Sequence, residues 1–132
     1  AGLIAHKLAN VPGASHCLRG GVVCYDNRVK SDLVGVPESM IREHGAVSAP
    51  VAEALAVGIR KKLATDLGVG IVGYAGPDAG GPDKPVGTVF AAVAGPDRTR
   101  AATFIWPGNR VEVQFRAAKM ALNLVRLYLL ES

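Results

Sequence analysis

The chain has 132 residues, of which 49% are hydrophobic and only 5% aromatic, and it contains 16 glycines. This length suits one domain over residues 1–132 with an aliphatic core, and the glycine content suits the tight connections of an α/β protein. The formal net charge is +4, carried by scattered Lys and Arg. That charge is compatible with an anionic small molecule, but without a basic run it argues against a nucleic-acid partner.

The sequence carries no signal for a membrane, a secreted scaffold or a metal. No run of about 18 apolar residues occurs, so we expect no membrane span, and the opening AGLIAHKLAN lacks the pattern of a signal peptide. Cys17 and Cys24 have no metal-ligand spacing, and the three histidines share none. We therefore expect a cytoplasmic protein with free thiols, no metal and no cofactor.

The first half of the chain is predicted to be mainly helical, with one strand. Apolar spacing predicts a short helix over Gly2–Asn10, and the β-prone run VVCY predicts a strand over Gly20–Tyr25. A helix capped by Asp26 or Asn27 is expected to reach Val34. Pro37-Glu38 then opens another helical turn that ends at His44-Gly45.

The second half is predicted to hold the rest of the sheet and two longer helices. Ser48 is a suitable N-cap for a helix whose apolar stripe recurs every four residues, at Val51, Leu55, Ile59 and Leu63. Strands are expected over 66–73, 86–94 and 99–106, the last two forming an antiparallel hairpin. A final helix follows Asn109, and the predicted buried face consists of Val111, Phe115, Ala118, Leu122, Val125 and Leu129. The expected fold is a three-layer α/β/α sandwich around a mixed β-sheet.

Two glycine-rich segments could bind a phosphate. Gly68 to Gly73 matches the dinucleotide spacing G-x-G-x-x-G, but its glycines lie inside the predicted strand and no helix follows, so we reject a Rossmann site. The loop 75–85 follows the end of a buried strand, where ligands of open α/β sheets gather, and is equally consistent with a rigid surface loop. Arg110 begins the last helix and could meet a phosphate there; taken alone, it reads as a solvated arginine.

The stretch GASHCLRGGVVCYDNRVK, residues 13–30, contains a possible catalytic set. A serine such as Ser15 can attack a carbonyl if a neighbouring base takes its proton. A lysine such as Lys30 is a base only when burial or nearby positive charge lowers its pKa from about 10.4 toward neutrality. Tyr25 could relay that proton. The alternative is a loop serine, a core tyrosine and a surface lysine, and spacing alone does not decide between them.

Six segments together resemble one known family. They are VPGAS, GGVVCYDNRVK, LVGVP, EHGAVS, YAGPDAGGPDKPVGTV and PGNR, and they run in family order across nearly the whole chain. On these motifs the sequence is similar to the CinA C-terminal domain family, whose enzymes include nicotinamide mononucleotide deamidases. The resemblance implies an α/β fold, a homo-oligomer, and hydrolysis of the carboxamide of nicotinamide mononucleotide without a metal.

The resemblance also implies roles for individual residues. The catalytic serine, tyrosine and lysine of the family fall on Ser15, Tyr25 and Lys30. The substrate-binding loop falls on Gly73, Tyr74, Ala75 and Gly76, and the arginine expected to bind the nucleotide phosphate falls on Arg110. In the expected mechanism Lys30, with Tyr25, deprotonates Ser15, which attacks the amide carbon while glycine N–H groups hold the oxyanion.

The chain departs from the family pattern in ways that define the alternative functions. Only the last glycine of the usual E-S-C-T-G-G turn is present, as Gly2, so the domain is expected to be incomplete at its N-terminus by one helix and one strand. Val72 replaces the usual Ser or Thr, and Tyr74 replaces an Ile. The alternative is a catalytically impaired module of the same fold that binds mononucleotides, or one that serves the DNA uptake suggested by the competence-linked family name.

Overall fold

The computed structural model describes residues 1–131, and two of its helices begin at a side-chain cap. Asp26 and Asn109 cap their helices with side-chain oxygens, and Pro50 lies in the first turn of another. The helices are α1 (Leu3–Ala9), the 3₁₀-helix η1 (Ala14–His16), α2 (Asn27–Val34), α3 (Glu38–His44), α4 (Ala49–Leu63) and α5 (Arg110–Leu130). These positions confirm the predicted helices to within a few residues.

The sheet has the order β1-β2-β3 and is antiparallel throughout the described residues. Its strands are β1 (Gly68–Gly73), β2 (Thr88–Ala94) and β3 (Thr99–Ile105). Gly68 pairs with Ala94 at one end of the β1/β2 ladder, and Gly73 pairs with Val89 at the other. The predicted β2/β3 hairpin is confirmed, with Ala94 opposite Thr99.

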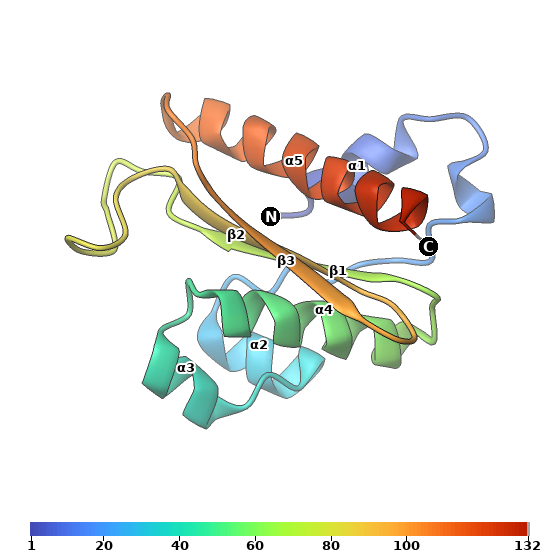
Figure 1. The fold of residues 1–132 in the computed structure, drawn as a ribbon, viewed down its shortest axis with the longest axis horizontal. Coiled ribbons are helices and arrows are strands. Elements are labelled where there is room, and N and C mark those ends of the chain that lie inside the picture. The colour runs from blue at the N-terminus through green and yellow to red at the C-terminus, as the bar shows by residue number, and fades with distance from the viewer. Residues whose placement is uncertain (132) are drawn as a thin grey trace.

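The elements form the three predicted layers, with α2, α3 and α4 on one face of the sheet and α1 and α5 on the other (Figure 1). Strand β2 lies in the middle and serves both cores, because successive side chains of a strand point to opposite faces. Ala92 and Ala94 belong to the cluster on the α4 side, whereas Val89, Ala91 and Val93 belong to the clusters on the α5 side. The fold is α/β, as predicted.

The glycines of GVGIVG allow α4 to lie directly against β1. A Cβ atom at Gly70 would lie 2.2 Å from the main-chain oxygen of Ala52, and one at Gly68 would lie 2.1 Å from that of Ala56. Real Cβ atoms do not approach this closely, so these positions need glycine for packing. The motif therefore shapes the core, which agrees with rejecting a dinucleotide site.

The predicted strand over Gly20–Tyr25 is wrong, and with it the prediction of a mixed sheet. The segment contains no strand or bridge residue, and the ladder contacts of β1 go to β2. Val22 and Cys24 pack against the core on the α4 side, whereas Val23 is 55% exposed. The β-prone composition gives an extended backbone, but a strand also needs a neighbouring main-chain edge with which to exchange hydrogen bonds.

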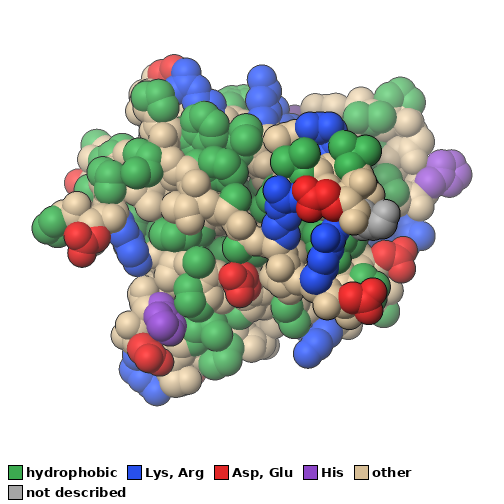
Figure 2. All heavy atoms as spheres, in the orientation of Figure 1, with side chains coloured by type: hydrophobic (Ala, Val, Ile, Leu, Met, Phe, Trp, Pro, Cys, Tyr) green, Lys and Arg blue, Asp and Glu red, His purple; other side chains and the backbone are tan. Residues whose placement is uncertain are grey.

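The predicted buried face of α5 is wrong for three of its six residues. Val111, Phe115 and Leu129 are exposed, while the buried residues are Val113, Ala117, Ala118, Ala121, Leu124 and Tyr128. The helix carries two apolar stripes, and the sheet packs against the one with more alanines, which permit close approach. Figure 2 shows hydrophobic side chains over the part of the surface where α5 lies. Among the described residues no helix has both the length and the apolarity needed to cross a membrane.

Candidate functional site

Tyr25 and Lys30 are brought together by the first turn of α2. The carboxylate of Asp26 caps the helix by accepting a hydrogen bond from the main-chain N of Arg28 at 2.7 Å. Lys30 follows one turn later and is only 6% exposed, and its Nζ donates to the main-chain oxygen of Tyr25 at 3.2 Å. An ammonium group has three N–H donors. Within residues 1–131 this is its one hydrogen bond, so donors are left for a ligand.

Arg110 joins this pair from the far end of the chain. It is the first residue of α5, where the side chain of Asn109 and that of Glu112 form a capping box that fixes the helix start. Arg110 Nη2 donates to the phenol oxygen of Tyr25 at 2.7 Å, and Nη1 donates to the main-chain oxygen of Gly76 at 2.6 Å. One guanidinium thus connects α5, the segment before α2 and the loop after β1.

Gly76 gives the loop after β1 the backbone shape that Arg110 needs. Its φ of +97° is one that side chains other than glycine rarely adopt, and a Cβ atom there would lie 2.7 Å from Cγ1 of Val86. The other predicted loop residues have different surroundings. The Tyr74 side chain packs against the core on the α4 side, Ala75 packs beneath the start of α5, and Gly73 ends β1. Gly76 is therefore the loop residue that meets the predicted phosphate-binding arginine.

The charge at this site is positive and not neutralised by a carboxylate. Arg110 takes part in no ion pair among residues 1–131, and neither does Lys30; the acidic Glu112 of the same helix turn lies beside Arg116, at 3.5 Å. Arg110 offers several N–H donors whose present acceptors are neutral oxygens, and a phosphate or carboxylate binds such a donor set more strongly. We refer to Tyr25, Lys30, Gly76 and Arg110 as the arginine site.

Ser15 lies outside the arginine site. It is an exposed residue of η1, which packs beside α1 in the layer of α5, whereas α2 packs against α4 across the sheet. In Figure 1 the segment after α1 lies at the end of the molecule where α5 finishes, and the loop after β1 lies at the end where α5 begins. Within the described residues no hydrogen bond joins Ser15 to Tyr25 or Lys30. The structure thus does not bring the predicted catalytic trio together.

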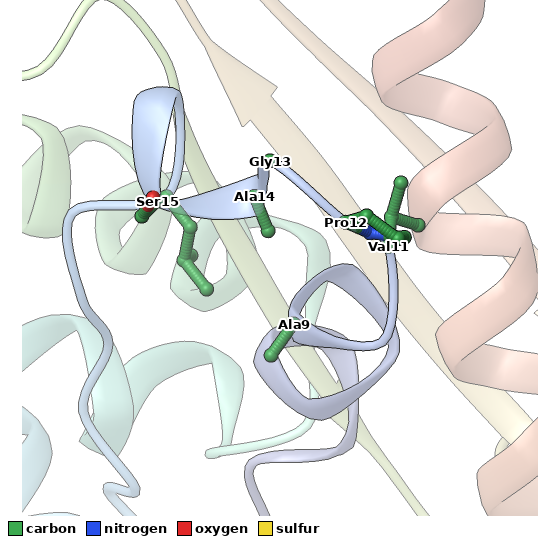
Figure 3. A pocket seen from close by; sticks show the side chains of 7 residues that line it. Ala9, Val11, Pro12, Gly13, Ala14 and Ser15 are labelled. Carbon is green, nitrogen blue, oxygen red and sulfur yellow. The ribbon is translucent and has the colours of Figure 1, made fainter.

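Ser15 contacts Arg19 on one side and borders an apolar pocket on the other. Its main-chain oxygen accepts from Arg19 Nη1 at 3.3 Å, as does that of His16. A shallow pocket beside it is lined by Ala9, Val11, Pro12, Gly13, Ala14 and Leu18 (Figure 3). None of these lining side chains can accept a proton, so the pocket supplies no base that would activate the hydroxyl.

One residue of functional interest was missed by the sequence prediction. Lys84, in the same loop as Gly76, reaches the turn between α3 and α4, where its Nζ donates to the main-chain oxygen of Val47 at 2.5 Å. The signal in the sequence was a single lysine within a loop rich in glycine and proline. Its contact with the EHGAVS segment, residues 43–48, is seen only in the structure.

Cys17 and Cys24 are free thiols, as the sequence predicts. Within residues 1–131 no three His, Cys, Asp or Glu side chains are grouped in a way that could hold a metal ion.

The sequence matches a described family over almost its whole length. The family model for the CinA C-terminal domain matches residues 1–129. A CinA-like protein of Gemmatimonas aurantiaca is 49% identical over 125 residues, which cover 95% of this chain and 29% of that protein. One from Anaeromyxobacter sp. (strain K) is 52% identical over 128 residues, covering 97% and 31%. The chain therefore spans about three tenths of the length of these curated relatives.

Solved structures with related sequences have the same fold. The competence/damage inducible protein of Agrobacterium tumefaciens aligns with a TM-score of 0.92 at 30% identity, covering 96% of this chain and 78% of that chain. A competence-damaged protein (CinA) superfamily protein of Escherichia coli aligns with a TM-score of 0.88 at 27% identity, covering 94% and 72%. Both fold and sequence lead to the same family.

Proposed function

We propose, because this chain belongs to the CinA C-terminal domain family, that it hydrolyses the carboxamide of nicotinamide mononucleotide. In the proposed reaction one water is consumed, the C–N bond of the carboxamide breaks, and nicotinate mononucleotide and ammonia are released. This makes the chain an amidase of pyridine nucleotide metabolism. A cytoplasmic location and a homo-oligomeric state stay predictions.

The observation that carries the proposal is the bridging position of Arg110. Its guanidinium contacts Tyr25 and Gly76 through neutral oxygens only, and it is exposed at the start of α5. A phosphate monoester arriving there would accept charge-assisted hydrogen bonds from the guanidinium. We therefore assign the nucleotide phosphate of the substrate to Arg110.

Lys30 is the group in this site best suited to act on the carboxamide. Its ammonium is buried, held by the main-chain oxygen of Tyr25, and retains donors that a substrate oxygen could accept. In the proposed reaction the Lys30 ammonium stabilises the negative charge that develops on the carboxamide oxygen and gives a proton to the departing amide nitrogen. The neutral amine that this leaves takes up the proton of the attacking water, so that Lys30 ends the cycle protonated and ammonia leaves. Tyr25 links Lys30 to Arg110, its main-chain oxygen binding the former and its hydroxyl the latter.

The proposal gives Ser15 no part in the chemistry. The attacking oxygen is that of a water, or of a hydroxyl other than Ser15, because Ser15 lies beside α1 rather than beside Lys30. This differs from the mechanism predicted from the sequence, in which Ser15 is the nucleophile. Serine is a residue type that can act as a nucleophile. We exclude Ser15 from the proposed mechanism only because of where it lies in the fold.

The test is release of ammonia from nicotinamide mononucleotide and from nicotinamide riboside, which lacks the phosphate. We expect turnover of the mononucleotide, with kcat/KM for the riboside at least about tenfold lower, because charge-assisted hydrogen bonds contribute about 1.5–3 kcal/mol. Equal turnover of both compounds would contradict the phosphate assignment to Arg110. No ammonia from either compound would contradict the amidase proposal.

A second candidate function follows from the position of Ser15. Because the predicted nucleophile lies away from Lys30 and Arg110, the arginine site could bind a mononucleotide without hydrolysing it. Calorimetry separates the two functions: heat of binding with nicotinamide mononucleotide, without ammonia release, would identify a binding module. A role in DNA uptake has no feature in the arginine site that favours it, and salt-sensitive DNA binding would be its signature.

A further inference from the structure

The loop between β1 and β2, residues 74–87, is folded at both its base and its tip. At the base, the main-chain N of Tyr74 donates to Thr88 O at 2.9 Å, and that of Gly87 donates to Tyr74 O at 2.7 Å. At the tip, Gly80 N donates to Lys84 O at 2.9 Å. Gly80 also lies against the Tyr74 ring, where a Cβ atom would come within 2.2 Å of a ring carbon. The loop thus has a defined shape of its own.

Two cationic side chains attach this loop to the rest of the molecule. Arg110 holds Gly76 near the start of the loop, as described above. Lys84 holds the other arm: its Nζ donates to Val47 O at 2.5 Å and, more weakly, to His44 O at 3.4 Å. Val47 and His44 belong to the turn between α3 and α4, nearly forty residues earlier in the chain.

The turn that receives Lys84 is itself shaped for this contact. His44 ends α3, where main-chain oxygens are left without helical partners and a cation is favoured. Gly45 has a φ of +80°, and a Cβ atom there would lie 3.7 Å from Lys84 Nζ. The hydroxyl of Ser48 donates to Gly45 O at 2.9 Å and so fixes the turn. Lys84 therefore binds two carbonyl groups, that of His44 at the end of α3 and that of Val47 in the turn that follows.

We infer that Lys84 is a positioning residue for the arginine site. By fixing the loop to the α3–α4 turn, it keeps Gly76 where Arg110 can bind it, and Arg110 in turn binds Tyr25. Lys84 does not touch the substrate in this arrangement; it acts through the backbone of the loop. The inference rests on the proposed function for its kinetic consequence, whereas the tether itself can be tested without any substrate.

The experiment compares four proteins: wild type, Lys84→Met, Lys84→Arg and Lys62→Met. Methionine keeps the length of the side chain and removes its donors, and arginine keeps the charge and donors. Lys62 is an exposed lysine of α4 and serves as the matched control. Amide hydrogen exchange of residues 75–87 reports the tether, and KM and kcat for nicotinamide mononucleotide report positioning.

For Lys84→Met we expect exchange in residues 75–87 to rise about tenfold and KM to rise about tenfold with kcat within about threefold, since a hydrogen bond from a charged group is lost. Lys84→Arg should restore both values to within about threefold, and Lys62→Met should match wild type. Unchanged exchange in Lys84→Met would overturn the tether. Faster exchange with KM and kcat of wild type would overturn the positioning role. If wild type releases no ammonia, the proposed function fails, and the affinity for the mononucleotide then replaces KM as the deciding value.

Discussion

Two parts of one stretch, residues 13–30, have opposite surroundings in the fold. Ser15 contacts residues of its own stretch: Arg19, four residues later, donates a hydrogen bond to the Ser15 main-chain oxygen. Tyr25 accepts a hydrogen bond from Arg110, which is 85 residues away in the sequence, and the same guanidinium also binds Gly76. The stretch contains reactive side chains throughout, but distant parts of the chain converge on only one end of it. Convergence of distant segments, more than residue type, identifies the candidate site.

The largest effect is expected from Lys30→Met, which keeps the buried volume and removes the ammonium. If Lys30 moves protons and stabilises charge on the carboxamide, ammonia release should fall by about 10²- to 10⁴-fold, the usual contribution of a general acid or base. The measurement is a coupled ammonia assay, with circular dichroism to confirm folding. Activity above about half of wild type in a folded variant would place the chemistry elsewhere.

Arg110 should have the next largest effect, and mainly on binding. Arg110→Ala should raise KM for nicotinamide mononucleotide by about ten- to a hundredfold, because charge-assisted hydrogen bonds to the phosphate are lost. Arg110→Lys keeps the charge but loses the two-pronged geometry, so its KM should lie between those of wild type and alanine. KM is measured from initial rates at fixed ionic strength. Equal KM values for the three proteins would show that Arg110 does not bind the phosphate.

Tyr25→Phe separates the role of the phenol hydroxyl from that of the rest of the arginine site. The change removes the hydroxyl that Arg110 contacts but keeps the ring and the main-chain oxygen that Lys30 contacts. Loss of one hydrogen bond predicts a rise in KM of about three- to tenfold, with a smaller change in kcat. A loss as large as that of Lys30→Met would instead indicate that the phenol itself takes part in the chemistry.

Ser15→Ala should have the smallest effect of the series. Ser15 is exposed and its hydroxyl makes no hydrogen bond within the described residues, so kcat/KM should stay within about twofold of wild type, as for most surface substitutions. Steady-state rates of ammonia release decide the point. A loss of activity on the scale of Lys30→Met would restore the serine mechanism predicted from the sequence.

The sequence was sufficient for those parts of the fold that depend on local signals. Caps and spacing located α4 and the start of α5, and turn residues located the β2/β3 hairpin. The buried face of α5 was missed because the helix has two apolar stripes, and only contact with the sheet selects between them. The strand over 20–25 was predicted wrongly, because pairing depends on a neighbouring edge that composition does not report.

The candidate site could be predicted only through family resemblance. Tyr25 and Arg110 are far apart in the sequence, and no spacing rule connects them. Their positions matched family motifs, and the structure brings those two together with Lys30 and Gly76. The same resemblance grouped Ser15 with them, whereas in the fold Ser15 lies beside α1, because a local motif does not say on which side of the sheet its residue will lie. Lys84 was missed because its partners are main-chain oxygens, which have no sequence signature.

The most direct test of the central claim is a crystal structure of the protein with nicotinamide mononucleotide bound. We expect phosphate oxygens within hydrogen-bond distance, about 2.7–3.2 Å, of the Arg110 guanidinium, and the carboxamide beside Lys30. This expectation would be contradicted by a carboxamide carbon within about 3–3.5 Å of the Ser15 hydroxyl oxygen, which is the distance for attack.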